Sequence, residues 1–195
     1  HNGPSPKDIT YRRLRSWARF KQKRICAWAH FALDGRHSLH LLNTHVSLPA
    51  FFLRAKGNGT GRFGEVENQV REVDQLLSFA RDRCREEPAV LVGDFNSLPG
   101  SIAYERVLSN GPFRACPVAI QATGTPVQAT AGMFGVRYEL DHIFFTDSVR
   151  TVEGGGKTCV GQDARWNGLS DHRPVIGDFQ LTERADVTGL AGVTS

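Results

Sequence analysis

Apolar residues recur along the chain with two different spacings, which predict helices packed on a sheet. Short apolar runs bounded by glycine, proline, asparagine or aspartate predict strands at 24–33, 38–46, 89–93, 138–145 and 172–181. Within 65–85 the apolar side chains fall on one stripe at helical spacing, which predicts an amphipathic helix. A second, short helix is expected at 102–108.

The strands at 24–33 and 38–46 are separated by Asp34-Gly35, a dipeptide typical of tight turns, so they are expected to form a hairpin. A glycine-rich loop at 56–61 lies between this hairpin and the long helix. Residues 1–181 are predicted to form one domain, and the small, polar residues 182–195 a flexible tail.

The composition is that of one globular domain, with 195 residues, of which 40% are hydrophobic and 23% charged. No stretch approaches eighteen consecutive apolar residues, so no membrane-spanning helix is expected. The chain begins at His1 without an initiating methionine, and its start lacks the apolar core of a signal peptide. We therefore expect the natural N-terminus to be missing.

Positive charge is concentrated at the start of the chain. Residues 1–24 carry a net charge of +7 and the remainder −3. Tyr11, Trp17 and Phe20 stand between these bases, a composition that can follow a phosphate backbone. The alternative, which we favour, is a solvated strand edge protected by charge.

The four cysteines, Cys26, Cys84, Cys116 and Cys159, are far apart and include no CxxC pair, which argues against a zinc site. We expect buried free thiols. Scattered cysteines favour a reducing, cytoplasmic compartment over a secreted disulfide framework, and secretion stays open.

Residues that suit a metal ion follow the strand at 89–93. Asp94 and Asn96 stand where the apolar run stops in a turn of glycine, asparagine, serine and proline. Oxygen ligands of this kind favour Mg²⁺, with Mn²⁺ or Ca²⁺ as alternatives. A single aspartate or asparagine at such a position more often caps the turn, so other motifs have to decide.

Four short motifs begin or end predicted strands. They are Asn43-Thr44-His45, Gly93-Asp94-Phe95-Asn96, Leu140-Asp141-His142-Ile143-Phe144 and Ser170-Asp171-His172-Arg173-Pro174-Val175. In this order they resemble the endonuclease/exonuclease/phosphatase superfamily, which includes the DNase I type nucleases, over roughly residues 24–181. The resemblance implies a four-layered α/β sandwich of two mostly antiparallel sheets flanked by helices. It also implies a metal-dependent phosphoesterase site at one end of the sheets.

The same resemblance assigns roles to the residues of these motifs. Asp94 would hold or activate the nucleophilic water, and Asn96 would fix that water and the scissile phosphate. Asp94, Asn96 and Asp171 would be the metal ligands.

The two histidines would act on the phosphate. His172 would contact it or transfer a proton, with Asp141 orienting its ring and raising its pKa. His45 would bind the phosphate or protonate the leaving group. Asn43 would support the strand end and is a candidate substrate-binding residue together with His45 and Asn96. Whether Asp94 or His172 is the general base stays open.

Other polar residues are expected to be structural. His30, His37 and His40 are interpreted as packing or surface residues, and His142, next to Asp141 in a strand, is expected on the opposite face. Gln69 is expected to be a helix-surface or hydrogen-bonding residue.

One departure from the superfamily pattern concerns the metal. The superfamily has a metal-binding glutamate well before the NTH motif, whereas the only acids before Asn43 are Asp8 and Asp34, neither in a matching context. The chain is then either part of a longer protein or has lost that ligand. We expect these 195 residues alone to be weakly stable and nearly inactive, and a longer parent to hydrolyse phosphoesters.

The substrate is the least determined inference. The histidine of the NTH motif fits the DNase I, sphingomyelinase and inositol-phosphate phosphatase branches, and the basic N-terminal stretch favours a nuclease with a nucleic-acid partner. The apolar residues 48–53 suit burial better than contact with membrane lipid. A non-catalytic binding module on the same fold is the alternative from another class. No protein partner is implied, and a monomer is expected.

Overall fold

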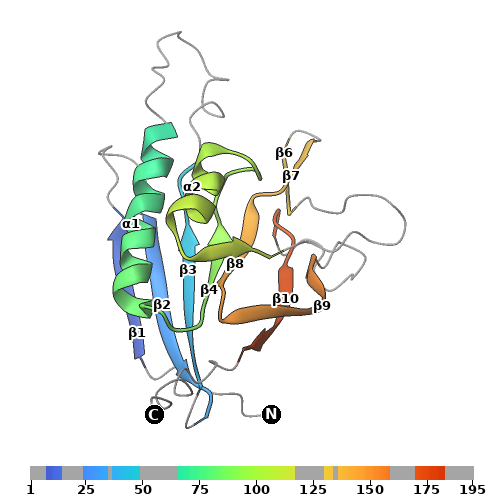
Figure 1. Ribbon diagram of the computed structural model, residues 1–195. Helices are drawn as coiled ribbons and strands as arrows, with labels where there is room; N and C mark the ends of the chain where they lie inside the picture. Colours follow the sequence, from blue (N-terminus) through green and yellow to red (C-terminus); the bar gives the residue numbers. More distant parts are fainter. Residues whose placement is uncertain are drawn as a thin grey trace, which may run out of the picture.

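The computed structural model describes residues 8–14, 24–34, 37–48, 66–116, 130–133, 136–158 and 170–182. Its centre is a six-stranded mixed sheet in the order β1-β2-β3-β4-β8-β5 (Figure 1). The strands of this sheet are β1 (Asp8–Leu14), β2 (Arg24–Ala32), β3 (Ser38–His45), β4 (Ala89–Asp94), β5 (Phe113–Ala115) and β8 (Asp141–Thr146).

The strand directions decide where the chemistry gathers. β2 and β3 form the antiparallel hairpin, with Cys26 opposite Thr44. β3 and β4 are parallel, and a parallel pair requires a crossover, which contains the helix α1 (Val66–Cys84). β8 then runs antiparallel to β4. The ends of β3 and β4 and the start of β8 therefore lie at the same edge of the sheet.

Both helices cover one face of the sheet (Figure 1). The helix α2 (Ile102–Asn110) begins after its N-cap Ser101, whose hydroxyl accepts the N–H of Tyr104. Between helices and sheet lies the larger core, and its fully buried members include Leu42, Val73, Leu76, Leu77, Leu91, Phe95, Val107 and Phe144.

The opposite face of the sheet carries a smaller core. Val90, Ile143 and Phe145 pack there with Val149 of β9 (Val149–Thr158) and with Phe179 of β10 (Val175–Leu181). β9 and β10 form an antiparallel pair, and β6 (Ala131–Met133) pairs with β7 (Val136–Tyr138). The described part of the chain is thus a mixed α/β fold with helices on one side of the main sheet and a two-stranded sheet on the other.

The predicted hairpin, the long helix and the buried strand after it are confirmed to within one residue at each end, and the short helix runs two residues further, to Asn110. The strand predicted at 138–145 is wrong at its start. Tyr138 belongs to β7, and β8 begins at Asp141. Two backbone N–H groups at this break, of Leu140 and Asp141, are bound by the hydroxyl of Thr130, which no strand pattern reveals.

The last strand also starts later than predicted, at Val175. His172 forms only an isolated bridge with Ala131, and Pro174 has no N–H to continue a ladder. Five strands had no prediction: β1 is rich in arginine, β9 contains three consecutive glycines, and β5, β6 and β7 have three residues each.

β1 contains Arg12 and Arg13 of the basic stretch and is the outermost of the described strands on its side of the main sheet. Residues 15–23, with most of the other bases, lie outside the described residues, so both explanations of the stretch stay predictions. Cys26 and Cys84 are buried free thiols as predicted, and Cys116 is half-buried. Cys159, the loop 56–61, residues 49–53 and the tail from 183 lie outside the described residues.

Neither described helix has the combination of length and apolar character that crossing a membrane demands.

Candidate active site

Three of the candidate residues occupy one row across three adjacent strands. His45 at the end of β3 is the register partner of Asp94 at the end of β4, and Asp94 is the partner of Asp141 at the start of β8. Residues in one row of a sheet point to the same face. This face is the one opposite the helices, so the three side chains meet at the rim of the smaller core.

Gly93 allows β3 and β4 to approach each other directly beside this row. Its φ is +144°, and a Cβ placed on it would clash with the carbonyl of Thr44. A side chain at this position would therefore push apart the strand ends that carry His45 and Asp94.

The turn after β4 fixes the carboxylate of Asp94. Asn96 has a left-handed φ of 48° and donates its backbone N–H to Oδ1 of Asp94 over 2.8 Å. Its amide Nδ2 donates to the carbonyl of Val46 over 2.9 Å and to Oδ2 of Asp94 over 3.3 Å. Since the nitrogen of the amide faces Asp94, Asn96 in this conformation holds the carboxylate rather than sharing a ligand with it.

Helix α1 holds the segments that follow β3 and β4 by hydrogen bonds to Ser47 and Asn96. Oε2 and Oε1 of Glu72 accept the backbone N–H and the hydroxyl of Ser47 over 2.7 and 2.6 Å. Nε2 of Gln69 donates to the carbonyls of Ser47 and Asn96, over 2.7 and 3.1 Å. Gln69 was interpreted as a helix-surface or a hydrogen-bonding residue, and the structure shows the second. The buried Glu72 was not predicted, because the spacing of residues in the helix gives no sign that it binds Ser47.

His172, which lies three residues before β10 and bridges to Ala131, completes the group. Its Nδ1 donates to Oδ2 of Asp141 over 2.7 Å. One ligand atom from each of Asp94, Asp141 and His172 lies within 4.8 Å of the other two. On the other side of Asp94, its Oδ2 lies 3.3 Å from Nε2 of His45. His45, Asp94 and Asp141, from three strand ends, thus lie in contact with one another or with His172, which precedes β10.

The environment changes the pKa of three of these groups. Burial, aided by the charge of Asp141, raises the pKa of Asp94 despite the N–H of Asn96. Burial, and then the charge of Arg24, lower the pKa of His45. Burial also acts to lower the pKa of His172, but the hydrogen bond and charge of Asp141 outweigh it and the pKa is raised. A carboxylate that disfavours its charge beside a histidine that favours its own is typical of acid–base sites.

Two candidates lie outside this group. Asp171 is exposed and is not among the three residues whose ligand atoms converge. Asn43 is exposed on β3, two residues before His45 on the same face, and its register partner on β4 is Val92. Their metal and substrate roles stay predictions.

His142 lies on the opposite face, as its alternation with Asp141 indicates. It is 6% exposed, and its Nε2 donates to the carbonyl of Ser97 over 2.7 Å. Burial lowers its pKa, so it is a neutral core histidine. Tyr104 packs edge-on against its ring.

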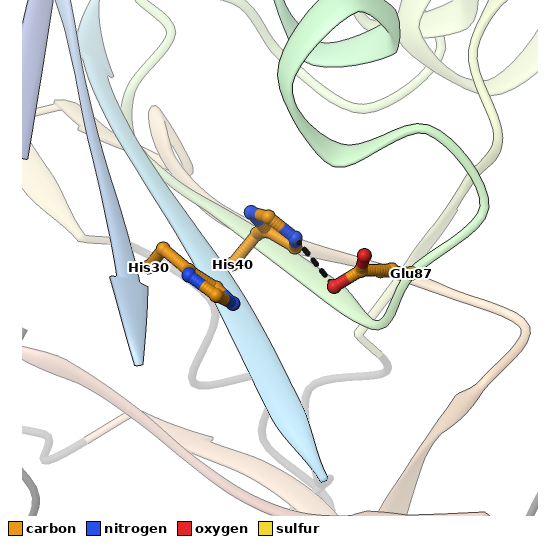
Figure 2. Close-up of side chains that lie close together, drawn as sticks. All are labelled: His30, His40 and Glu87. Atoms are coloured by element: carbon orange, nitrogen blue, oxygen red, sulfur yellow. Dashed lines mark hydrogen bonds and ion pairs between the residues drawn. The ribbon is translucent and has the colours of Figure 1, made fainter. Parts of the chain in front are cut away.

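His30, His40 and Glu87 form a second cluster at the other end of the sheet (Figure 2). The indole N–H of Trp28 donates to Nδ1 of His40 over 3.0 Å, so the proton of this imidazole is on Nε2, which donates to Oε2 of Glu87 over 3.0 Å. His30 stacks on His40 with ring centroids 4.7 Å apart. The contacts of His40 in this cluster are those of a packing network, which agrees with its interpretation from sequence.

The sequence over residues 18–172 matches the Endonuclease/Exonuclease/phosphatase family. The chain belongs to this family. No curated protein matches it in sequence.

Solved structures share its fold at low sequence identity. A Bacteroides vulgatus endonuclease/exonuclease/phosphatase is 21% identical with a TM-score of 0.69, covering 92% of this chain and 67% of its own. The human Nocturnin catalytic domain with bound sulfate is 17% identical with a TM-score of 0.66, covering 91% and 60%. ANGEL2, a 2′,3′-cyclic phosphatase in complex with adenosine-2′,3′-vanadate, is 15% identical with a TM-score of 0.62, covering 93% and 68%. This family member therefore spans about two thirds of the length of these structures.

Proposed function

We propose that this chain carries the catalytic end of a divalent-metal-dependent phosphoesterase that cleaves phosphodiester bonds with an activated water. The observation that supports this most is the meeting of Asp94, Asp141 and His172 within 4.8 Å, with His45 beside Asp94, in a chain of this family. Two carboxylates and two imidazoles supply the acid, base and ligand groups that phosphoester hydrolysis needs.

The donor set fits a hard cation. Asp94 is the side chain best placed to hold it. Asp141 already binds His172, and Asn96 directs its amide nitrogen rather than its oxygen toward the site. When bound, a divalent cation would neutralise phosphoryl oxygens and stabilise the leaving alkoxide. Mg²⁺ is the expected ion, with Mn²⁺ or Ca²⁺ as alternatives, and Asp171 is a further candidate ligand from the edge of the site.

The two histidines divide the proton chemistry. Asp141 holds Nδ1 of His172 and favours the charged ring, which suits His172 to bind a phosphate oxygen and to carry a proton there. The lowered pKa of His45 keeps its ring neutral near pH 7, beside the carboxylate that would orient the attacking water. In this assignment Asp94 positions the water and is the base, and Asn96 keeps the Asp94 carboxylate in place.

A nucleic-acid phosphodiester is the proposed substrate class, because the N-terminal 24 residues carry a net charge of +7. The cyclic phosphatase activity named for ANGEL2, a structural neighbour, also concerns a nucleotide phosphate. Sphingomyelin and inositol phosphates are the alternatives within the same chemistry. A non-catalytic binding module is the alternative of another class.

The proposal includes the wider architecture of the family, in which the described helices, main sheet and β9–β10 pair would be three of the four layers of one domain over residues 1–181.

The test is a substrate panel of plasmid DNA, RNA, sphingomyelin, inositol phosphates and a chromogenic phosphodiester, each with Mg²⁺, Mn²⁺ or EDTA. It uses the polypeptide of the complete reading frame, since this chain spans 60 to 68% of its structural neighbours. Metal-dependent hydrolysis of DNA or RNA is expected. Preference for sphingomyelin or an inositol phosphate would replace nucleic acid as the proposed substrate. If no member of the panel is hydrolysed, a non-catalytic binding module becomes the better explanation.

A further inference from the structure

Thr130 lies at the point where the segment of Asp141 and the segment of His172 come together. Its side chain is buried, with 1% exposed. Its Oγ1 accepts the backbone N–H of Leu140 and that of Asp141, both over 3.0 Å. The strand β5 pairs with β8 as far as Phe144, and the N–H of Cys116 donates to the carbonyl of Ile143. Among the described residues, it is Thr130 that binds the N–H groups at the start of β8.

The backbone of the same residue holds the other segment. The carbonyl of Thr130 accepts the N–H of Arg173 over 2.6 Å, and the next residue, Ala131, bridges to His172. The N–H of Thr130 donates to the carbonyl of Tyr138 over 2.8 Å, which ties it to the strand β7 before Asp141. One buried residue thus contacts the chain on both sides of the 2.7 Å bond between Asp141 and His172.

We propose that Thr130 is a positioning residue for the Asp141–His172 pair, acting through its hydroxyl on the backbone of Asp141 and through its main chain on that of His172. The inference rests on the proposed function of that pair. The hydrogen bonds of Thr130 go to backbone groups, so its contribution is to the distance between the two side chains.

The hydroxyl provides a selective way to test this. Thr130→Val keeps the shape of the side chain and removes the acceptor, which leaves the N–H groups of Leu140 and Asp141 without their partner. Thr130→Ser keeps the acceptor. Thr146 offers a matched control, because it ends β8, the strand that Asp141 begins, is 8% exposed, and its Oγ1 accepts the N–H of Ala89 over 3.0 Å at the far end of the sheet.

The experiment compares Thr130→Val, Thr130→Ser and Thr146→Val by two measurements. The first is proton NMR of the downfield Nδ1–H signal of His172, which reports the bond to Asp141 without any turnover. The second is kcat and KM in the complete polypeptide on the best substrate of the panel. For Thr130→Val we expect loss of the signal and a fall in kcat of about 100-fold with KM within about threefold, since a small misplacement of catalytic groups has this order of effect.

Thr130→Ser is expected to keep the Nδ1–H signal and a kcat within about threefold of the parent. Thr146→Val is expected to keep the signal and the kcat as well, although it should lose as much stability as Thr130→Val. If Thr130→Val does not fold, Thr130→Cys replaces it, because sulfur is a weak acceptor and should weaken the signal in a folded protein.

An unchanged Nδ1–H signal in Thr130→Val, or an equal loss in Thr146→Val, would overturn the positioning role. If the parent enzyme hydrolyses no substrate, the proposed function fails, and the NMR comparison still decides the role of Thr130.

Discussion

Asp94 and Asp141 are register partners on β4 and β8, so two carboxylates lie side by side at the end of the main sheet. Adjacent like charges are costly unless a positive group compensates them. His172 contacts one carboxylate and His45 the other, at 2.7 and 3.3 Å. Such an arrangement lowers stability, and it is typical of active sites.

Asp94→Asn should therefore make the metal-free protein more stable while it removes activity. The raised pKa of Asp94 shows that the fold disfavours this charge, first through burial and then through Asp141. We expect a gain of roughly 0.5–2 kcal/mol in the free energy of unfolding, measured in urea at pH 7 with EDTA. The control is Asp147→Asn, whose carboxylate is 71% exposed in its pair with Arg114 and should change stability by less than about 0.5 kcal/mol. A marked loss of stability in Asp94→Asn would contradict the inference that the charge of Asp94 destabilises the fold.

Gly93→Ala should be strongly destabilising, by about 3 kcal/mol or more, because a Cβ there meets the Thr44 carbonyl and the φ of +144° is unfavourable for alanine. Gly100→Ala is the matched control. Gly100 also has a positive φ, +80°, but nothing lies within 4 Å of an added Cβ, so only the backbone cost of about 1 kcal/mol is expected. Equal losses in the two variants, measured by urea unfolding, would show that close approach of the strands is unimportant.

Glu72→Gln tests the support that α1 gives to the strand ends. The substitution places an amide NH₂ against one of the two donors of Ser47, in a side chain that is 2% exposed. We expect a loss of about 1–3 kcal/mol in unfolding free energy. Glu105→Gln, in the first turn of α2, is the control and should change stability by less than about 0.5 kcal/mol. Equal stability of the two variants would show that Glu72 does not support the strand ends.

Acid should destabilise the protein through His40. Its folded-state pKa is lowered, first by burial, below the ordinary value of about 6.5. Between these two pKa values the unfolded chain binds a proton that the folded chain does not, so stability is present above about pH 6.5 and is lost as the pH falls toward the folded value. His142 acts in the same direction and His172, with its raised pKa, in the opposite one.

A comparison of variants isolates the His40 contribution. Urea unfolding of the parent and of His40→Gln is measured at pH 7.5 and 5.5. The variant should be less stable at pH 7.5, because it disturbs the Trp28–His40–Glu87 bonds, but should lose less stability on acidification. An identical loss in both proteins would show that His40 is not the buried neutral group described above.

The sequence predicts the elements whose pattern is regular and the residues whose chemistry repeats a family motif. The apolar stripe of α1 and the hairpin β2–β3 follow directly from spacing, and the motif residues His45, Asp94, Asp141 and His172 do converge. Their roles in catalysis and metal binding stay predictions.

What the sequence does not contain is the set of long-range hydrogen bonds that hold these residues. Thr130 and Glu72 are an unremarkable threonine and a helical glutamate until the fold brings them to Asp141 and Ser47. The start of β8 was predicted too early for the same reason, because a side-chain hydroxyl and not a strand partner satisfies its first N–H groups. Such partners are set by tertiary contacts, which local pattern does not encode.

The most direct test of the central claim is hydrolysis of a chromogenic phosphodiester by the complete polypeptide, before and after EDTA and with Mg²⁺ restored, in the parent and in Asp94→Asn and His172→Ala. The account predicts turnover that EDTA abolishes and Mg²⁺ restores, and a fall of at least about 100-fold in each folded variant. Hydrolysis that persists in EDTA, or full turnover in either variant, would contradict it.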